Sequence, residues 1–550
     1  MRTLTSTRER SLEHLLEAAF SRGAEAVLVL ALHGLLCCVA QAQKPVISWV
    51  NQAGGGDEDF GWGIAIDSGT NVYATGHFTA PAAFGSTNID RAARQEVFVA
   101  RYSTNGAFLC VRQAGGPTND DARGIVADPH GNVYVTGNFT GPGTFSPFVL
   151  GGFGGPDVFV AKYDRNGNVL WVQQAGGAGD DEGQSIALDG AGNVLVTGYF
   201  SGTAVFGSTH LVSRGSRDIF LACYDSAGAL LWAGSAGGSN ADEGLGVAAD
   251  ASGNSYLTGY FSTPASFGTN RVTGSGPQDI FVAKYDDAGN LLWIKPAGGA
   301  IGDVGHSVAV DSASSVCVTG SFNGMARFED VTLQSNGSAA DIFVAKYDPT
   351  GHLLWVRREG GDGPDNGNGV GVDANDSIYV AGQFLGTIVL GTNVFNSPSH
   401  ADVFVANYDP AGTLRWAVRA GGTAYKAAYA IAVDPQGPAF IAGFFRGATT
   451  FGDFNLLGHP QSSNRDVFVS RVDGPPSPPP TPRLGITVAG NQVILSWPAN
   501  ATGFRPEAVT NLVKNSFWST ITNVPSRSAG KNFITNAISG STRFYRLRIP

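Results

Sequence analysis

One column of acidic residues recurs along this chain at a nearly constant interval. Its members are Asp59, Asp120, Asp181, Asp242, Asp303 and Asp365, and the seventh copy has Lys426 instead. Carboxylates that converge on one point can bind a hard cation such as Ca²⁺ or the hydroxyls of a sugar. The alternative is that each aspartate accepts hydrogen bonds from local backbone N–H groups and fixes a turn between two repeats. Identical placement in six copies favours this structural alternative, because a ligand site usually breaks the symmetry of a repeat.

If the strand that follows each aspartate is the innermost strand of its repeat, these carboxylates surround one mouth of a central channel. They are therefore the candidate cation or ligand ring of this protein. No other cofactor is expected.

A second acidic column is filled in all seven copies: Asp67, Asp128, Asp189, Asp250, Asp311, Asp373 and Asp434. Each member precedes a short Gly- or Asn-containing stretch between two apolar runs. An Asx-type turn, in which the carboxylate bonds to the backbone two residues further on, explains the whole column.

No catalytic motif stands out. The histidines after residue 42 occupy different positions in the repeat, and Cys110, Cys223 and Cys317 are far apart and odd in number. Neither set has the spacing of metal ligands or of a disulfide framework, so the three cysteines are expected to be buried or half-buried free thiols. The best departure from the repeat is Lys426 with Tyr425 and Tyr429, which would have to supply the acid/base chemistry of an enzyme.

The elements that carry these columns repeat seven times. A T-G-x-F theme places its glycine at Gly76, Gly137, Gly198, Gly259, Gly320, Gly382 and Gly443. A second column reads Trp49, Cys110, Trp171, Trp232, Trp293, Trp355 and Trp416, and is expected to pack on outer strands. Successive copies lie 61 residues apart, with a single interval of 62. Chance does not produce such a period.

Each copy contains four short runs rich in β-branched and aromatic residues, and none has helical periodicity. In the third copy they are residues 184–188, 193–200, 218–224 and 230–233. Four antiparallel strands at a constant period predict a β-propeller blade. The chain is therefore expected to be all-β, with a seven-bladed β-propeller over residues 43–474.

The phase of the first copy predicts how the ring closes. Residues 47–50 correspond to the last strand of a blade, whereas residues 466–472, at the end of the repeats, correspond to a third strand. The N-terminal strand is thus expected to complete the seventh blade, which leaves no open sheet edge at the seam.

These motifs carry a family resemblance. The pattern G-x-[IV]-A-x-D, G-N-x-Y-[VL]-T-G-x-F, D-[IV]-F-[VL]-A-K-Y-D and G-N-L-L-W resembles the SBBP-type bacterial β-propeller repeat over about residues 46–473. The strand order also resembles that of NHL propellers. The resemblance implies the fold and a secreted or cell-surface address; it implies no defined activity and no catalytic residues.

The N-terminus has the features of an export signal. An apolar run at residues 26–40 follows several arginines, and Ala40-Gln41-Ala42 matches the small-x-small pattern before a cleavage site. Residues 1–42 are expected to be a signal peptide. A retained anchor, or lipidation at Cys37 or Cys38, is the alternative.

A proline-rich segment at residues 475–482 predicts a stiff linker. Residues 483–550 then contain strand-like runs at 484–489, 492–497, 518–523 and 543–549. They resemble the roughly fibronectin-III-like β-sandwich modules that end many secreted verrucomicrobial proteins in an F-Y-R-L-R sequence.

Charge and composition narrow the function. The net charge of −10 and the absence of a Lys/Arg cluster argue against a nucleic-acid partner, and no later segment has the length of a membrane span. The leading hypothesis is a non-enzymatic, monomeric scaffold or binding protein for an extracellular polysaccharide or a protein. The alternatives are an extracellular hydrolase or lyase acting on polysaccharide, and a purely architectural surface protein.

Overall fold

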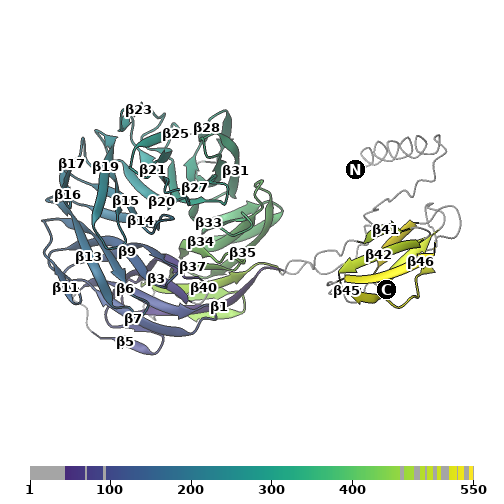
Figure 1. Cartoon of the computed structure of the whole chain (residues 1–550). Coiled ribbons are helices and arrows are strands. Elements are labelled where there is room, and N and C mark those ends of the chain that lie inside the picture. The colour runs from purple at the N-terminus through teal and green to yellow at the C-terminus, as the bar shows by residue number, and fades with distance from the viewer. Residues whose placement is uncertain are drawn as a thin grey trace. The chain divides into compact units, whose positions relative to one another are not determined.

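The chain is described here by a computed structural model (Figure 1). It forms two compact units, residues 43–475 and residues 476–550 with residues 1–42. The described residues are 44–68, 71–90, 94–337, 339–458 and 464–475 in the first unit, and 484–489, 492–498, 505–509, 519–528, 531–537 and 544–548 in the second. The predicted signal peptide and most of the predicted linker lie outside them. The described residues include no helix long and apolar enough to cross a bilayer.

The first unit is an all-β arrangement of antiparallel sheets, in which each sequence repeat supplies an inner pair of strands. The innermost strands are β2 (Phe60–Ile66), β8 (Asp121–Ala127), β14 (Glu182–Leu188), β20 (Glu243–Ala249), β26 (Val304–Val310), β32 (Asp365–Val372) and β36 (Lys426–Val433). The second strands are β3 (Asn71–Thr79), β9 (Val133–Thr140), β15 (Val194–Phe200), β21 (Ser255–Phe261), β27 (Val316–Asn323), β33 (Ile378–Leu390) and β37 (Ala439–Phe445).

Two further strands complete the four that were predicted for each repeat. The third strands are β6 (Gln95–Ser103), β12 (Pro156–Tyr163), β18 (Asp218–Tyr224), β24 (Asp279–Tyr285), β30 (Ala340–Tyr347), β34 (Asn393–Tyr408) and β40 (Asp466–Asp473). The fourth strands are β7 (Phe108–Ala114), β13 (Val169–Gly177), β19 (Leu230–Gly238), β25 (Leu291–Gly299), β31 (Leu353–Gly361), β35 (Leu414–Gly422) and β1 (Val46–Gly55).

An outer hairpin between the second and third strands was not predicted. The hairpins are β4–β5 (Ala82–Phe84, Thr87–Ile89), β10–β11 (Gly143–Phe145, Phe148–Leu150), β16–β17 (Thr203–Phe206, Thr209–Val212), β22–β23 (Ala265–Phe267, Asn270–Val272), β28–β29 (Met325–Phe328, Val331–Gln334) and β38–β39 (Ala448–Phe451, Phe454–Leu457). In the sixth repeat the hairpin is continuous with β33 and β34. The hairpins pair with the fourth strand of the preceding repeat, as β16 does with β13, so most of the sheets are wider than four strands. The exception is β10–β11, which reaches the preceding repeat only through a bridge between Thr144 and Gly115, so that the sheet β2–β3–β6–β7 keeps four strands.

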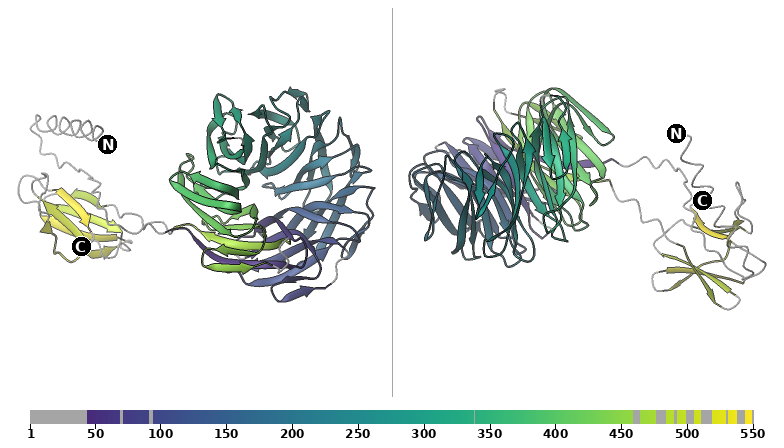
Figure 2. Two further views of the ribbon diagram at one scale, coloured as in Figure 1. Left: turned by 180° about the vertical axis from the view of Figure 1, so that it is seen from behind. Right: turned by 90° about the horizontal axis from the view of Figure 1, so that it is seen from above.

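The innermost strands lie next to one another around a common centre. Each contacts the innermost strand of the following repeat, and β36 contacts β2. Figure 2 shows the sheets of this unit arranged side by side around that centre. The N-terminal strand β1 pairs antiparallel with β40, from Val46 opposite Asp473 to Ala53 opposite Val467, as the repeat phase predicted.

Small residues let neighbouring innermost strands approach closely. A Cβ on Gly124 would lie 3.0 Å from the backbone nitrogen of Ile186 in the next repeat. Farther out, Phe and Val side chains of adjacent sheets interleave, and the resulting cores contain mostly fully buried residues. Apolar burial on both faces of a sheet is expected when each sheet is covered by neighbours on both sides.

The Trp column packs on the neighbouring repeat, as expected. Trp171 lies against Gly228 of the next repeat, and its Nε1–H donates to the carbonyl of Ser226 at 3.2 Å. Trp49, Trp232, Trp293 and Trp355 donate in the same way. These side chains fix one sheet on the next and are not an open aromatic platform.

The second unit contains two small sheets. One has the order β41–β42–β46–β45 (Gly485–Ala489, Gln492–Pro498, Lys531–Ala537, Ser526–Ser528). The other has the order β44–β43–β47 (Ser519–Thr520, Arg505–Val509, Phe544–Arg548). Val493, Leu495, Trp497 and Ile534 form its buried core. Strands β43, β45 and β46 were not predicted.

Candidate functional site

Each innermost strand contains an irregularity at the same place. In β2 the pairing with β3 shifts between Gly61 and Gly63, so Trp62 has no partner residue opposite it. The same shift occurs in β8, β14, β20, β26, β32 and β36. An extra residue of this kind is a β-bulge, which redirects a side chain that regular alternation would place elsewhere. The fold therefore presents one bulge residue from every repeat.

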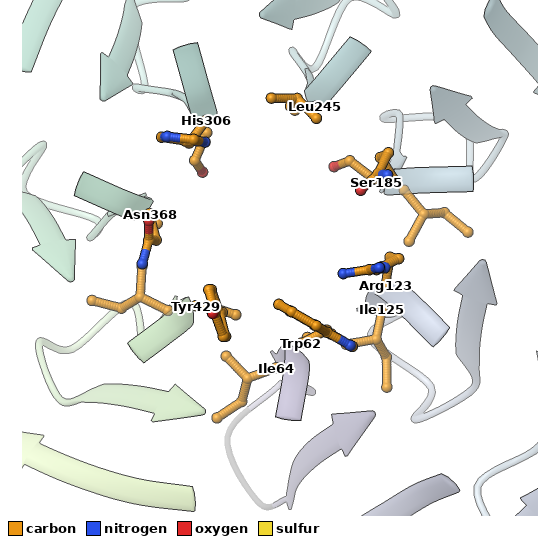
Figure 3. Close-up of a pocket in the computed structure, with 18 of the residues that line it drawn as sticks. Trp62, Ile64, Arg123, Ile125, Ser185, Leu245, His306, Asn368 and Tyr429 are labelled. Atoms are coloured by element: carbon orange, nitrogen blue, oxygen red, sulfur yellow. The ribbon is translucent and has the colours of Figure 1, made fainter. Parts of the chain in front are cut away.

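The bulge residues, which we call the bulge ring, are Trp62, Arg123, Gln184, Leu245, His306, Asn368 and Tyr429. All are half-buried and line a central cavity of about 330 Å³, a volume in the range of small-ligand sites. Figure 3 shows six of them arranged around one opening: Trp62, Arg123, Leu245, His306, Asn368 and Tyr429. The neighbouring positions are Gly, Ala or Ser in every repeat, whereas the bulge residue differs in all seven.

One sector of the ring is aromatic. The rings of Phe60 and Trp62 stack with centres 4.8 Å apart and planes 7° from parallel. Tyr429 lies across the seam between the first and last repeats, its ring centre 4.3 Å from that of Trp62. The guanidinium of Arg123 covers the Trp62 ring at 4.1 Å from its centre. This sector offers flat apolar surface with polar groups at its edges, as aromatic binding sites do.

Behind that sector the charges are paired. Arg123 Nε lies 2.8 Å from Glu182 and 3.0 Å from Asp121, and His77 Nδ1 lies 2.9 Å from Asp121. Burial alone would lower the pKa of Arg123, but the two carboxylates raise it above its ordinary value. Burial likewise opposes ionisation of Asp121, yet Arg123 and His77 hold the pKa of that carboxyl below its ordinary value. His77 Nδ1 also lies 3.4 Å from Trp62 Nε1, so His77 helps to hold Trp62 in place.

The opposite sector carries neutral polar groups. Burial lowers the pKa of His306 to about 4, so its imidazole is neutral at pH 7 and can both donate and accept a hydrogen bond. Asn368 Nδ2 donates to the carbonyl of Ala428 in the next repeat at 2.8 Å, which orients the amide. Gln184 and Ser185 complete the polar lining. The cavity therefore combines an aromatic surface with amide, hydroxyl and imidazole groups.

The first acidic column takes no part in the cavity, and its contacts fit the backbone-turn alternative that its identical placement favoured. Its side chains are fully buried and absent from the cavity lining: Asp59, Asp120, Asp181, Asp242, Asp303 and Asp365. In each, Oδ2 accepts from the second glycine of the Gly-Gly pair that ends the preceding fourth strand, or from Gly116 or Gly55 at the same position. Oδ1 accepts from the residue that follows the T-G-x-F strand. The carboxylates are satisfied by backbone N–H groups and join consecutive sheets.

A second carboxyl group lies beside each of these aspartates. At Gly176, for example, an added Cβ would lie 2.2 Å from Asp157 Oδ1 and 2.9 Å from Asp181 Oδ2, so both carboxyls press on this glycine. The corresponding pairs are Asp59 with Asp466, Asp120 with Glu96, Asp242 with Asp218, Asp303 with Asp279 and Asp365 with Asp341. Among the described residues no group of three or more His, Cys, Asp or Glu is placed to hold a metal ion.

The seventh repeat replaces the carboxyl pair by an ion pair. Lys426 Nζ lies 2.7 Å from Asp402 Oδ1, and both side chains are fully buried. Tyr425 and Lys426 are not among the cavity-lining residues, whereas Tyr429 is. The predicted cluster of Lys426, Tyr425 and Tyr429 is thus divided between the interior of the fold and the bulge ring.

The carboxyl pairs predict an unusual dependence of stability on pH. Burial, with a smaller contribution from the neighbouring acid, raises the pKa of Asp365 to about 8 and of Asp181 and Asp242 to about 7. Their unfolded values are near 3.8, so the native state binds more protons than the unfolded state between these limits. This stabilisation is complete at low pH and is lost as pH rises through the raised pKa values. We expect thermal unfolding of residues 43–550 to occur at lower temperature at pH 8 than at pH 6.5.

The variant Asp157→Asn should reduce that slope. Asp157 Oδ1 has no hydrogen-bond partner, and an amide nitrogen at this place can donate toward the carboxylate of Asp181. The matched control is Asp164→Asn, at a surface turn whose carboxyl already has a lowered pKa. A melting temperature that rises from pH 6.5 to pH 8 in the unmodified chain would contradict this account of the pairs.

The Asx-type turns and the free thiols that the sequence predicted are present. Asp128 Oδ1 accepts from the backbone of His130 and Asn132, and its equivalents make the same Asx-type turn contacts. Cys110 is half-buried, Cys223 and Cys317 are buried, and all three are free. The bulge ring itself was not predicted. The sequence does contain a signal for it: one position differs in all seven copies and is flanked by Gly, Ala or Ser in each of them.

The fold and these columns define an all-β propeller-repeat protein. In agreement, the SBBP β-propeller repeat family matches residues 111–141 and 170–199. These two segments are therefore similar to SBBP repeats.

Two curated proteins resemble parts of the chain. An uncharacterized WD repeat-containing protein of Acanthamoeba polyphaga mimivirus is 26% identical over 410 residues, which cover 59% of this chain and 29% of that protein. Regulatory protein FlaEY of Caulobacter vibrioides is 32% identical over 139 residues, which cover 24% of this chain and 14% of that protein. The chain thus matches less than a third of the length of either relative.

Solved structures show more distant likeness. Sqt1 from Chaetomium thermophilum aligns with 82% of this chain and 97% of its own at 11% identity and a TM-score of 0.39. A puromycin hydrolase aligns with 81% of this chain and 59% of its own, at 13% identity and a TM-score of 0.36.

Proposed function

We propose that this chain is a secreted or cell-surface, non-enzymatic binding protein. Its SBBP repeats form a closed seven-bladed propeller whose bulge ring engages an extracellular polysaccharide, and residues 483–550 form a β-sandwich module. The observation that carries the proposal is the bulge ring. Every repeat directs one side chain into the same cavity, and all seven side chains differ.

Asymmetry separates this site from the structural columns. A residue that serves the fold is repeated, as the buried aspartates and the outer tryptophans are. A residue that contacts one face of an asymmetric ligand is expected to differ from the equivalent residues of the other repeats, which contact other parts of the ligand. The bulge residues differ widely in size and chemistry, whereas their neighbours are always Gly, Ala or Ser. This contrast favours recognition of a ligand.

The chemistry of the cavity favours a neutral sugar. The apolar face of a sugar ring can lie on Tyr429 and against the edge of Trp62, whose faces are covered by Phe60 and Arg123. The hydroxyls of the sugar can bond to Asn368 and His306. Asp121 and Glu182 lie directly behind Arg123, and the net charge of the chain is −10. Both features disfavour an anionic polymer, so neutral polysaccharides should bind better than polyuronates.

The competing hypothesis is a hydrolase or lyase that acts on polysaccharide. Glycosidases commonly use a pair of carboxyl groups that flank the scissile bond. The described residues that line the cavity include no Asp or Glu. This favours binding over catalysis, and an assay for new reducing ends during prolonged incubation with each bound polymer distinguishes the two.

The test is calorimetric titration of residues 43–550 with neutral and anionic oligosaccharides. Trp62→Ala should weaken binding of the preferred neutral ligand at least about tenfold, because it removes the ring against which Arg123 and Tyr429 are held in the cavity wall. Leu231→Ala is the matched control, since Leu231 is 52% exposed on an outer strand. Equal affinity in the two variants would overturn the assignment of the site; binding of a protein in place of every sugar would overturn the ligand class.

A further inference from the structure

A second cavity lies away from the bulge ring, between the sheets of the third and fourth repeats. Its volume is about 370 Å³, and its walls include the apolar side chains of Leu221, Leu257 and Leu291. Trp232 and Gly234 of β19 form part of it. A Cβ built on Gly234 would meet no atom within 4 Å, so the cavity opens at this glycine.

Other repeats fill the equivalent position with a side chain. The residues that correspond to Gly234, two positions after each member of the Trp column, are Asn51, Arg112, Gln173, Lys295, Arg357 and Val418. Arg112 Nε donates to the carbonyl of Gly167 at 3.1 Å, and Arg357 Nε donates to the carbonyl of Gly412 at 3.2 Å. In both cases the acceptor is the glycine in the hairpin turn of the next repeat.

The first repeat shows what an arginine does to this space. The cavity lined by Cys110, Arg112 and Gly167 has a volume of only about 20 Å³. The third repeat keeps the hairpin glycine, with Gly289 at the place of Gly167, but it has Gly234 in place of Arg112 and Trp232 in place of Cys110. The open cavity, at about 370 Å³ against about 20 Å³, has more than enough room for an arginine side chain, and Gly289, the equivalent of the glycine whose carbonyl accepts, is part of its wall.

The surroundings of the open cavity also suit a cation. The face of Trp232 packs on Gly289, where an added Cβ would lie 2.8 Å from the ring, and aromatic faces attract guanidinium groups. The turn that contains Gly289 begins with Asp286 and Asp287. Hydrogen bonds from Asn290, offset in part by burial, lower the pKa of Asp286, which keeps this carboxyl ionised at neutral pH.

We propose that this cavity binds an arginine side chain of a partner protein. The guanidinium donates to the carbonyl of Gly289, as Arg112 and Arg357 do within the chain, and its methylene groups pack on Trp232. The site is independent of the bulge ring, so the protein can hold a polysaccharide and a protein partner at once.

The probe is the blocked tripeptide acetyl-Gly-Arg-Gly-amide, titrated calorimetrically into residues 43–550. We expect saturable binding to one site, weakened at least about tenfold when citrulline replaces arginine, because citrulline keeps the shape and loses the charge. Trp62→Ala should leave this binding unchanged, which separates the inference from the proposed function. Equal binding of the two peptides would overturn it.

Two variants use the repeat as its own control. Gly234→Arg should fill the cavity, abolish peptide binding and raise the melting temperature. Arg357→Gly should open an equivalent cavity beside Trp355 and Gly412, so that the stoichiometry rises from one peptide to two. If Gly234→Arg does not fold, Arg357→Gly decides the matter. A stoichiometry that stays at one in Arg357→Gly, or undiminished binding to a folded Gly234→Arg, would show that the peptide binds elsewhere.

Discussion

Replacing Lys426 by methionine is expected to destabilise the propeller by about 3–5 kcal/mol at neutral pH, the usual cost of leaving one partner of a buried ion pair uncompensated. Lys426 and Asp402 are both fully buried, and their charged atoms lie 2.7 Å apart. Methionine keeps the length of the side chain and removes the charge, so the loss reports the ion pair and not a cavity. Urea unfolding followed by fluorescence measures it.

Two further variants sharpen this prediction. Arg419 bonds to the other oxygen of Asp402 but is 36% exposed, so Arg419→Met should cost clearly less than Lys426→Met. The equivalent of Lys426 in the other six repeats is Asp, and Lys426→Asp should therefore fold, with a carboxyl pair in place of the ion pair. Unchanged stability of Lys426→Met would contradict the structural role assigned here.

Deletion of residues 46–53 is expected to cause the largest loss of stability. These residues contain most of β1, which pairs with β40 and connects it to β4. Ile47, Trp49 and Ala53 are buried, and burial of each large side chain contributes about 1.5–3 kcal/mol before the lost strand pairing is added. The melting temperature should fall by more than about 10 °C, and the transition should broaden because the sheet edge of β40 is exposed.

Rescue in trans separates ring closure from simple truncation. A synthetic peptide of residues 44–55, added in excess, should occupy the open edge of β40 and restore part of the lost melting temperature. The same peptide with Ile47 and Trp49 replaced by serine should not. An unchanged melting transition in the deletion variant would mean that β1 does not hold the propeller together.

The period of the sequence was sufficient to predict the inner four strands and the pairing of β1 with β40. A constant spacing indicates that every copy has the same structure. The repeats begin with a fourth strand and end with a third strand, so these two strands are expected to pair and complete one sheet. Hairpins such as β4–β5 were not predicted because a strand of three residues is too short to show an alternation of apolar and polar side chains. Their pairing is also set by the neighbouring repeat, which local sequence does not encode.

The site was harder to predict because it depends on a break in regular structure. Strict alternation along β2 assigns Trp62 to a sheet face, and only the bulge between Gly61 and Gly63 turns it into the cavity. The acidic column, in contrast, is constant because it serves the regular structure. Asp181 is repeated because each sheet needs the same two backbone contacts at Gly177 and Ser201. Positions that are constant among the repeats serve the fold, whereas the positions that differ in every repeat line the cavity.

Hydrogen–deuterium exchange with and without the preferred neutral polysaccharide tests the central claim most directly, because it reports on every strand at once. The bulge ring predicts slower exchange in the bound protein at the innermost strands of several repeats, above all β2, β8 and β36, which carry Trp62, Arg123 and Tyr429. Outer strands such as β7 and β19 should be unaffected. Protection confined to those outer strands or to residues 483–550, with the innermost strands unchanged, would contradict the account.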